Sequence, residues 1–417
     1  MKKILSLIFA LMLTFGVTSC HYQRLSDGEE DEEITLAVSD PAYYEKFKGK
    51  DISINVYNWG EYISDGSDGL LDVNTEFTSL TGIKVNYSTY ATNEELYAKL
   101  KGGGTNYDVI IPSDYMIARM IKEGMLQKLN YANISNFANI MPKFVGNIYD
   151  PNDEYSVPYT WGTVGIIYDN TAVEVPEDGM DWDILWDDEY KDSILMFDNP
   201  RDSFAIASLL LGNSINTESF TELKDAAEKL KEQKSIVQSY VMDEIFDKMG
   251  AGEAVLAPYY AGDAVTLMDE YDHLSFATPK SGTNLFIDAM CIPASSSQKE
   301  AAEAYINFMC EPDIAYSTTS YIGYSTPNSA AFEMLDDEVK NDGISYLPDE
   351  FIEEKTTIFN NLSDEANLEM QRLWTDMKST EEAGTNKWVV PLFLLFCVAL
   401  SIGILIRRYI KNKKDIF

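Results

Sequence analysis

The sequence contains few histidines, cysteines and basic residues. Of its 417 residues, 2 are His and 4 are Cys, and 68 acidic residues outnumber 32 basic ones, for a net charge of −36. Such an acidic chain is not expected to bind nucleic acid, because a phosphate backbone requires clustered Lys and Arg. The scarcity of His argues against hydrolysis through a Ser-His pair.

Known catalytic and metal-binding motifs are also missing from the sequence. There is no G-x-S-x-G, Walker loop, H-E-x-x-H or Cys/His metal spacing. The sequence therefore predicts no enzyme, no cofactor and no metal site. In contrast, 45% of the residues are hydrophobic and 12% aromatic, which is enough for a large core. The length predicts two folded domains with appendages.

The first 20 residues have the pattern of a lipoprotein signal peptide. Lys2 and Lys3 precede an apolar run from Ile4 to Val17, which is shorter than the roughly 20 residues of a membrane-spanning helix. The four residues that end at Cys20 resemble a bacterial lipobox, in which the Cys becomes diacylated. We expect residues 1–20 to be the signal peptide and Cys20 to carry lipid; the alternative is an incidental Cys near a cleavage site.

The C-terminal part has the pattern of a transmembrane helix. Residues 388–406 are almost uninterruptedly apolar, and a polar linker, 379–387, precedes them. The tail, 407–417, contains five basic residues, which predicts that it lies in the cytoplasm and that the acidic body lies outside the membrane.

Periodicity along the exported body predicts two α/β domains. Residues 21–50, with an acidic run from Asp27 to Glu33, are expected to be a solvated tether, and folding is expected to begin near Asp51. Strand and helix patterns then alternate as βαβαβα up to Glu123, which predicts a parallel sheet. A second set of such patterns follows, and the part after Gln298 is mainly helical.

Two cysteines, Cys291 and Cys310, lie in the exported body. Export permits a disulfide between them, but buried apolar roles in a strand and at a helix end are an equal alternative.

An aromatic residue stands near a carboxylate at five places where a strand is expected to end. Loops at the C-terminal ends of parallel strands are where open α/β sheets bind ligands. Taken singly, each aromatic could belong to the core, and Asp114 and Asp263 are better explained as helix caps. Five such places together favour a ligand site. They are residues 57–62, 112–115, 197–202, 259–263 and 285–288.

Several motifs resemble those of the spermidine/putrescine-binding proteins of polyamine ABC transporters, a branch of the periplasmic binding proteins. The resemblance extends from about Asp51 to Lys378 and does not include the predicted C-terminal helix. The motifs are residues 57–62, 81–90, 97–100, 123–128, 155–162 and 322–328.

The resemblance implies a fold with two discontinuous α/β lobes, joined by strands that cross twice, with the ligand in the cleft. Lobe 1 would comprise residues 51–161 and 287–331, and lobe 2 residues 162–286 and 332–378. The chain would capture spermidine or putrescine and deliver it to the permease subunits in the membrane.

The resemblance also implies a set of site residues. Aromatic walls would cover the methylenes of the polyamine, acids would hold its ammonium groups, and Ser113 would be a polar contact. Asn199 stands where the family has an aspartate. The aromatic box would be Trp59, Tyr62, Tyr115, Tyr260, Phe286 and Tyr324, and the acids Glu61, Asp202 and Asp288.

Three other functions remain open from the sequence. The adjacent Tyr259 and Tyr260 resemble the phenolate ligands of ferric-ion-binding relatives. A carboxylate pair, Asp198 and Asp202 or Glu61, could serve a glycoside hydrolase. The C-terminal helix could make the chain a sensor or a permanently tethered subunit.

Overall fold

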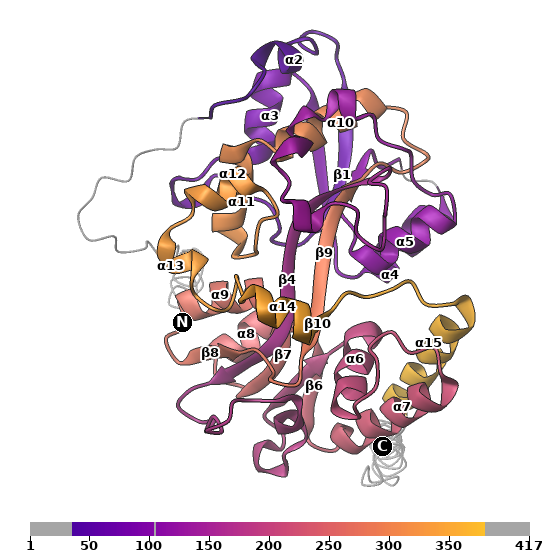
Figure 1. The fold of residues 1–417 in the computed structure, drawn as a ribbon, viewed down its shortest axis with the longest axis vertical. Helices are drawn as coiled ribbons and strands as arrows, with labels where there is room; N and C mark the ends of the chain where they lie inside the picture. The colour runs from indigo at the N-terminus through magenta and orange to yellow at the C-terminus, as the bar shows by residue number, and fades with distance from the viewer. Residues whose placement is uncertain (1–35, 104–105, 380–417) are drawn as a thin grey trace, which may run out of the picture. The chain divides into compact units, whose positions relative to one another are not determined.

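The computed structural model describes residues 36–103 and 106–379 (Figure 1). Cys20, the signal peptide and the predicted helix at 388–406 lie outside these ranges. Within the described part of the chain, no helix has both the length and the apolar character needed to cross a membrane. The chain divides into two compact units, residues 1–371 and residues 372–417. The sheet lies in the first unit.

The first half-sheet contains three parallel strands, β1 (Ser53–Trp59), β2 (Lys84–Tyr90) and β3 (Val109–Ile110), in the order β2-β1-β3. The βαβαβα pattern predicted from the sequence is therefore confirmed. The connecting helices are α3 (Val73–Thr81), α4 (Asn93–Gly102) and α5 (Asp114–Lys122). Helix α3 begins where Asp72 accepts a hydrogen bond from the Thr75 N–H, and it ends at Gly82, whose φ of 74° favours glycine.

The second half-sheet contains β5 (Ile194–Phe197), β6 (Val237–Val241), β7 (Leu256–Tyr260) and β8 (Leu274–Ala277). Strand β5 pairs in parallel with both β6 and β7. The second predicted α/β region is thus confirmed. Its helices are α6 (Pro200–Leu210), α7 (Phe220–Lys234), α8 (Glu244–Gly250) and α9 (Ala261–Glu270).

Two long crossing strands, β4 (Ser156–Asp169) and β9 (Thr283–Cys291), join the half-sheets (Figure 1). The first half of β4 pairs antiparallel with β9, and its second half pairs with β7 and β8. Pro158 and Gly162 lie inside β4, although neither residue favours the interior of a strand. Both crossing strands are almost fully buried, which fixes their positions.

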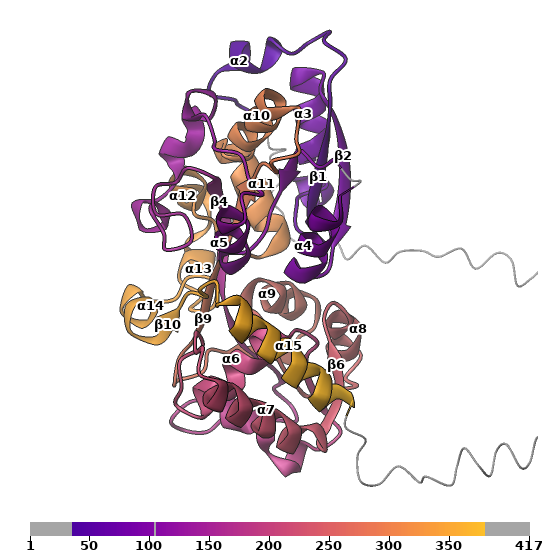
Figure 2. The same cartoon turned by 90° about the vertical axis from the view of Figure 1, so that its right-hand side faces the viewer.

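The C-terminal part returns past the crossing strands. Its short strand β10 (Thr356–Thr357) pairs in parallel with the start of β9. In Figure 2, α10 and α11 lie near β1, and α6 and α7 lie near β6. The helices of this part are α10 (Lys299–Met309), α11 (Pro312–Ile322), α12 (Ser329–Met334), α13 (Asp337–Lys340), α14 (Asp349–Lys355) and α15 (Asp364–Ser379).

The prediction that residues 21–50 form a tether is wrong for residues 36–50. This segment contains α2 (Pro41–Glu45), and the side chains of Tyr44 and Phe47 are buried. The Tyr44 hydroxyl donates to Glu311 Oε1 (2.7 Å). The partner lies 267 residues away, so the local acidic pattern gave no sign of this contact.

The two cysteines of the body, Cys291 and Cys310, are both buried and free. The disulfide alternative is therefore wrong. Burial also raises the pKa of each thiol, so both remain protonated and unreactive at neutral pH.

Candidate functional site

Four of the predicted aromatic residues form one continuous row of rings. The ring of Tyr62 contacts that of Tyr324 edge-on at a centroid distance of 4.8 Å. Tyr324 is followed by Phe286 at 6.0 Å, and Phe286 by Tyr260 at 5.3 Å. These residues come from the turn after β1, the turn after α11, strand β9 and the end of β7. The fold therefore brings together segments that lie far apart in the sequence.

Asp288 lies beside this row, in the interior of β9. Its side chain is 4% exposed, and its Oδ2 atom accepts a hydrogen bond from the Tyr62 hydroxyl (2.7 Å). Burial raises the pKa of Asp288 to about 6, although hydrogen bonds from Ser113 and Tyr62 oppose the rise. The other carboxylate oxygen, Oδ1, is buried and has no hydrogen-bond partner among the described residues. It is an unused acceptor of the kind that an ammonium group satisfies.

Asp202 lies at the other end of the row, in the first turn of α6. Its Oδ2 atom accepts hydrogen bonds from the Tyr260 hydroxyl (3.1 Å) and from Asn199 Nδ2 (2.6 Å). Asn199 is also the N-cap of α6. Burial raises the pKa of Asp202 to about 7.

The predicted Trp59 and Tyr115 make their side-chain contacts with residues outside the row of rings. The Trp59 indole N–H donates to the Ile111 carbonyl (2.9 Å), and its ring lies 4.6 Å from that of Tyr90. The Tyr115 hydroxyl donates to Glu94 Oε1 (3.1 Å). Burial raises the pKa of Tyr115, and the charges of Glu94 and Asp202 add to the rise.

Glu61 differs from the other predicted site residues. Its side chain is exposed and its backbone is left-handed, with φ 48°. In residues 36–103 and 106–379, no hydrogen bond joins Glu61 to the cluster. The structure therefore places one predicted acid in solvent while it buries the other two.

The expected position of the fifth motif is also wrong. Phe286 and Asp288 do not follow a strand but lie within β9. Their side chains alternate with those of Leu285 and Ile287, which therefore project to the opposite side of the strand.

Sequence reasoning missed the roles of two carboxylates that it had explained as helix caps. Asp263 caps no helix; its Oδ2 atom accepts a hydrogen bond from the Tyr324 hydroxyl (2.8 Å), and burial raises its pKa to about 7. Asp114 accepts hydrogen bonds from the backbone N–H groups of Tyr115 (2.6 Å) and Ile287 (3.1 Å) and caps no helix either. No local signal could have indicated the role of Asp263, because its partner Tyr324 lies 61 residues further along the chain.

A buried arginine, Arg201, lies next to the cluster and was also missed. Its Nη2 donates to Asn216 Oδ1 (2.8 Å) and to the Asn360 carbonyl (3.1 Å). Its guanidinium lies over the rings of Phe359 (4.3 Å) and Tyr115 (5.8 Å). Nε and Nη1 have no hydrogen-bond partner in the described part of the chain.

Comparison with known proteins identifies the family. Residues 105–355 match the family described as bacterial extracellular solute-binding protein. A spermidine/putrescine-binding periplasmic protein of Salmonella typhimurium is 40% identical over 291 residues, which cover 70% of this chain and 82% of the relative. The chain belongs to the bacterial extracellular solute-binding proteins. The resemblance inferred from the sequence motifs is thereby confirmed.

Solved structures of the family have the same mixed α/β fold. A putative spermidine/putrescine ABC transporter protein from Listeria monocytogenes is 33% identical, with a TM-score of 0.74 over 78% of this chain and 99% of that chain. A spermidine/putrescine substrate-binding protein from Streptococcus pneumoniae is 35% identical, with a TM-score of 0.67 over 79% and 99%. The relatives are thus named as binding proteins of transport systems.

In this solute-binding protein, α9 and the turn after α11 are in very close contact. A Cβ atom added at Gly262 would lie 2.1 Å from the Tyr324 ring. Gly323, with φ 73°, also lies close to Gly262, because a Cβ atom added there would be 2.7 Å from the Gly262 carbonyl oxygen. Only glycine at these positions allows the two elements to approach so closely.

Proposed function

We propose that this protein is the solute-binding component of a polyamine ABC transporter, and that it holds spermidine or putrescine between two lobes. One observation supports this proposal most strongly. Asp288 is a buried carboxylate with an unused oxygen, beside a row of aromatic rings. A protonated amine would supply the missing partner, and the rings would cover its alkyl chain.

The energetics indicate why both rings and acids are needed. Burying about seven methylenes of spermidine at about 0.8 kcal/mol each gives roughly 5 kcal/mol. Each ring against an ammonium group adds about 0.5–2 kcal/mol, whereas association costs about 4–15 kcal/mol. Micromolar affinity requires about −8 kcal/mol. The carboxylates must therefore supply the difference.

The proposed site contains the predicted residues and one addition. The addition is Asp263, because its side chain is half-buried and accepts a hydrogen bond from Tyr324, a member of the row. With Asp202 at the Tyr260 end, carboxylates lie at several points along the rings, as the spaced ammonium groups of a polyamine require. The predicted members are Trp59, Glu61, Tyr62, Ser113, Tyr115, Asn199, Asp202, Tyr260, Phe286, Asp288 and Tyr324.

We assign the lobes as the motifs implied, with one extension. Lobe 1 comprises residues 51–161 and 287–331 and includes the docked segment 36–50. Lobe 2 comprises residues 162–286 and 332–378. The crossing strands would act as the hinge, so that closure around the ligand could be read by the permease.

The protein is proposed to function on the outer side of a membrane. Sequence patterns support removal of residues 1–20, lipidation of Cys20 and a transmembrane helix at 388–406, with the tail 407–417 in the cytoplasm. Tethering would raise the local concentration of the protein at its permease. Mass spectrometry of the N-terminal peptide tests the lipid: an unmodified Cys20 in the mature protein would refute lipidation.

The alternatives of iron binding and glycoside hydrolysis gain no support. Tyr260 donates to Asp202, whereas Tyr259 hydrogen-bonds with Asp243, so the two phenols have different partners. Over the ranges that the structure describes, no cluster of three or more His, Cys, Asp or Glu could hold a metal ion. We therefore propose no second function.

Calorimetric titration of the full-length protein with spermidine and with putrescine tests the proposal. We expect one site per chain with micromolar or tighter affinity for at least one of the two. No binding of either amine at millimolar concentration would refute the proposed function.

A further inference from the structure

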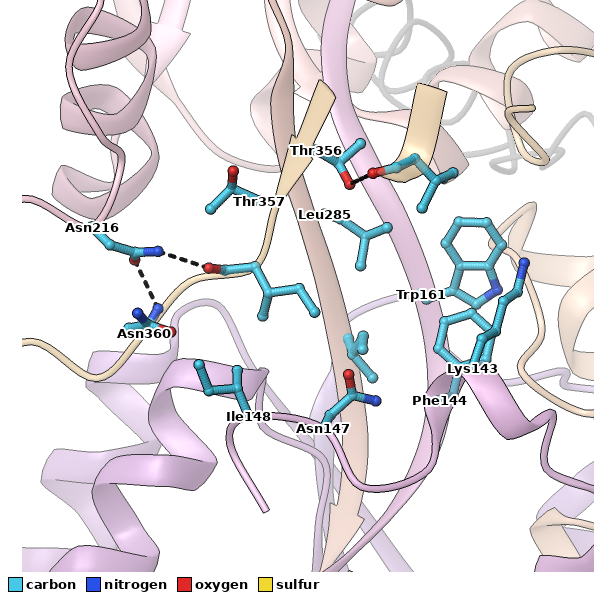
Figure 3. A pocket seen from close by; sticks show the side chains of 13 residues that line it. Lys143, Phe144, Asn147, Ile148, Trp161, Asn216, Leu285, Thr356, Thr357 and Asn360 are labelled. Carbon is cyan, nitrogen blue, oxygen red and sulfur yellow. Dashed lines mark hydrogen bonds between the residues drawn. The ribbon is translucent and has the colours of Figure 1, made fainter. Parts of the chain in front are cut away.

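A cavity lies on the opposite side of the crossing strands from the ring cluster. It has a volume of about 460 Å³, and Leu285, Ile287 and Trp161 line it (Figure 3). Because residues alternate along β9, Leu285 and Ile287 project to this cavity while Phe286 and Asp288 face the cluster. The cavity and the proposed polyamine site therefore share the same two strands.

The cavity lining differs in charge from the rest of the protein. Its walls are mostly apolar or uncharged, with rings from Phe144 and Trp161, and no carboxylate lines it, although the chain has 68 acidic residues. Lys143 is its one charged lining residue. A polyamine would find no anion there, so the cavity suits a different class of ligand.

Two hydrogen-bond donors at the cavity are available to a ligand. The Nδ2 atom of Asn147 is buried and has no partner among the described residues. Lys143 pairs with Asp349 at 3.5 Å, but the Asp349 side chain is 84% exposed, so the pair is weak and easily exchanged. Donors of this kind favour a ligand that carries an acceptor with negative charge.

We propose that this cavity binds a small aromatic carboxylate. The Phe144 and Trp161 rings and the aliphatic wall would hold its ring, and Asn147 would donate to its carboxylate. The ammonium of Lys143, which lies over the Trp161 ring at 5.2 Å, would attract the carboxylate from the edge of the cavity. The volume is within the range of about 300–1,000 Å³ that is typical of small-molecule sites.

An occupant of this cavity would also affect lobe closure. The walls come from both proposed lobes, Asn147 from lobe 1 and Asn216 from lobe 2, so the cavity width depends on the hinge angle. In this structure the lobes meet on the cluster side, where Tyr324 donates to Asp263. If the lobes separated on the cluster side, the cavity on the other side of the hinge would become narrower. A ligand in the cavity therefore favours the closed arrangement of the lobes.

Arg201 provides a direct contact between the two sites. It donates to Asn216 and to the Asn360 carbonyl at the cavity wall, and it adjoins Asp202 in the ring cluster. Figure 3 shows Asn216 and Asn360 hydrogen-bonded to one another at this wall. The coupling to polyamine binding rests on the proposed function, whereas the cavity site itself does not.

The binding experiment uses indole-3-acetate and 1-naphthoate as probes of the full-length protein, with calorimetry and saturation-transfer NMR as readouts. We expect one saturable site per chain. Asn147→Leu and Lys143→Gln should each weaken binding about fivefold or more, whereas Lys128→Gln, which alters a surface ion pair with Glu154, should not. The proposal is wrong if neither probe binds at about 10 mM, a concentration that corresponds to a weak-binding limit of about −3 kcal/mol. It is equally wrong if Asn147→Leu and Lys143→Gln bind the probes like the unaltered protein.

The coupling experiment repeats the spermidine titration with the cavity saturated by indole-3-acetate. We expect the Kd for spermidine to fall about fivefold or more, the lower end of typical coupling between sites. An unchanged or increased Kd would overturn the coupling. If spermidine does not bind at all while the probe titrations behave as expected, the polyamine function is refuted and the cavity site is supported.

Discussion

The substitution Asp288→Asn should have opposite effects on ligand affinity and on stability. Asparagine keeps the shape of the side chain and can still accept from the Tyr62 hydroxyl, but it removes the negative charge. The loss of one partner from a buried charge pair costs about 2–5 kcal/mol. The Kd for spermidine at pH 8 should therefore rise between about 30-fold and several thousandfold.

The same substitution should stabilise the protein without ligand. Burial raises the pKa of Asp288 from 3.8 to about 6. A raised carboxyl pKa means that the ionised form disfavours folding, and this cost is fully present above pH 6 and disappears at low pH. The difference corresponds to about 3 kcal/mol, which is the upper limit of the gain in unfolding free energy expected from Asp288→Asn at pH 8.

Asp150→Asn is the matched control, because Asp150 is an equally buried carboxylate away from the cluster. Its oxygens accept hydrogen bonds from the backbone N–H groups of Glu154, Tyr155 and Ser156. This control should lower stability and leave affinity unchanged. Calorimetry measures affinity and urea unfolding at pH 8 measures stability. Spermidine binding by Asp288→Asn within threefold of the unaltered protein would refute our account of Asp288.

Three further predictions concern pH, closure and the N-terminal segment. Burial raises the pKa of Asp202 and Asp263 to about 7. Below pH 6, polyamine affinity should therefore fall about tenfold per pH unit for each of these carboxylates that must be ionised to bind the ligand. An affinity that stays constant in calorimetry between pH 5 and 8 would contradict this prediction. Gly262→Ala should weaken spermidine binding by about tenfold or more, because the added Cβ would overlap the Tyr324 ring and such overpacking costs about 1–3 kcal/mol. Unchanged spermidine affinity would show that the contact between Gly262 and Tyr324 does not matter for lobe closure. Tyr44→Phe should lower the unfolding free energy by about 1–3 kcal/mol, because the buried Glu311 loses a hydrogen-bond donor. The substitution should leave spermidine affinity unchanged. If the variant is as stable in urea as the unaltered protein, the result would contradict the docking of residues 36–50.

The sequence predicted the fold well where local periodicity determines it. The alternation from Asp51 to Glu123 predicted the parallel half-sheet that β1, β2 and β3 form. It failed where long-range contacts decide the structure. The N-terminal segment folds only because Glu311 and its neighbours cover Tyr44, and no local pattern contains that information.

The candidate site could be predicted in its residue types but not in its geometry. The motifs selected Tyr62, Tyr260, Phe286 and Tyr324, which the structure places in one row. They could not distinguish a capping carboxylate from a buried one, because both follow a strand. Asp263 was therefore explained as a cap, although its partner, the Tyr324 hydroxyl, lies 61 residues further along the chain.

The most direct test of the central claim is a crystal structure of the protein with spermidine. The account predicts the alkyl chain along the Tyr62 to Tyr260 row, with ammonium nitrogens at hydrogen-bond distance, about 2.7–3.2 Å, from Asp288 and Asp202. Spermidine bound elsewhere, or bound between the lobes without contact to Asp288, would contradict it.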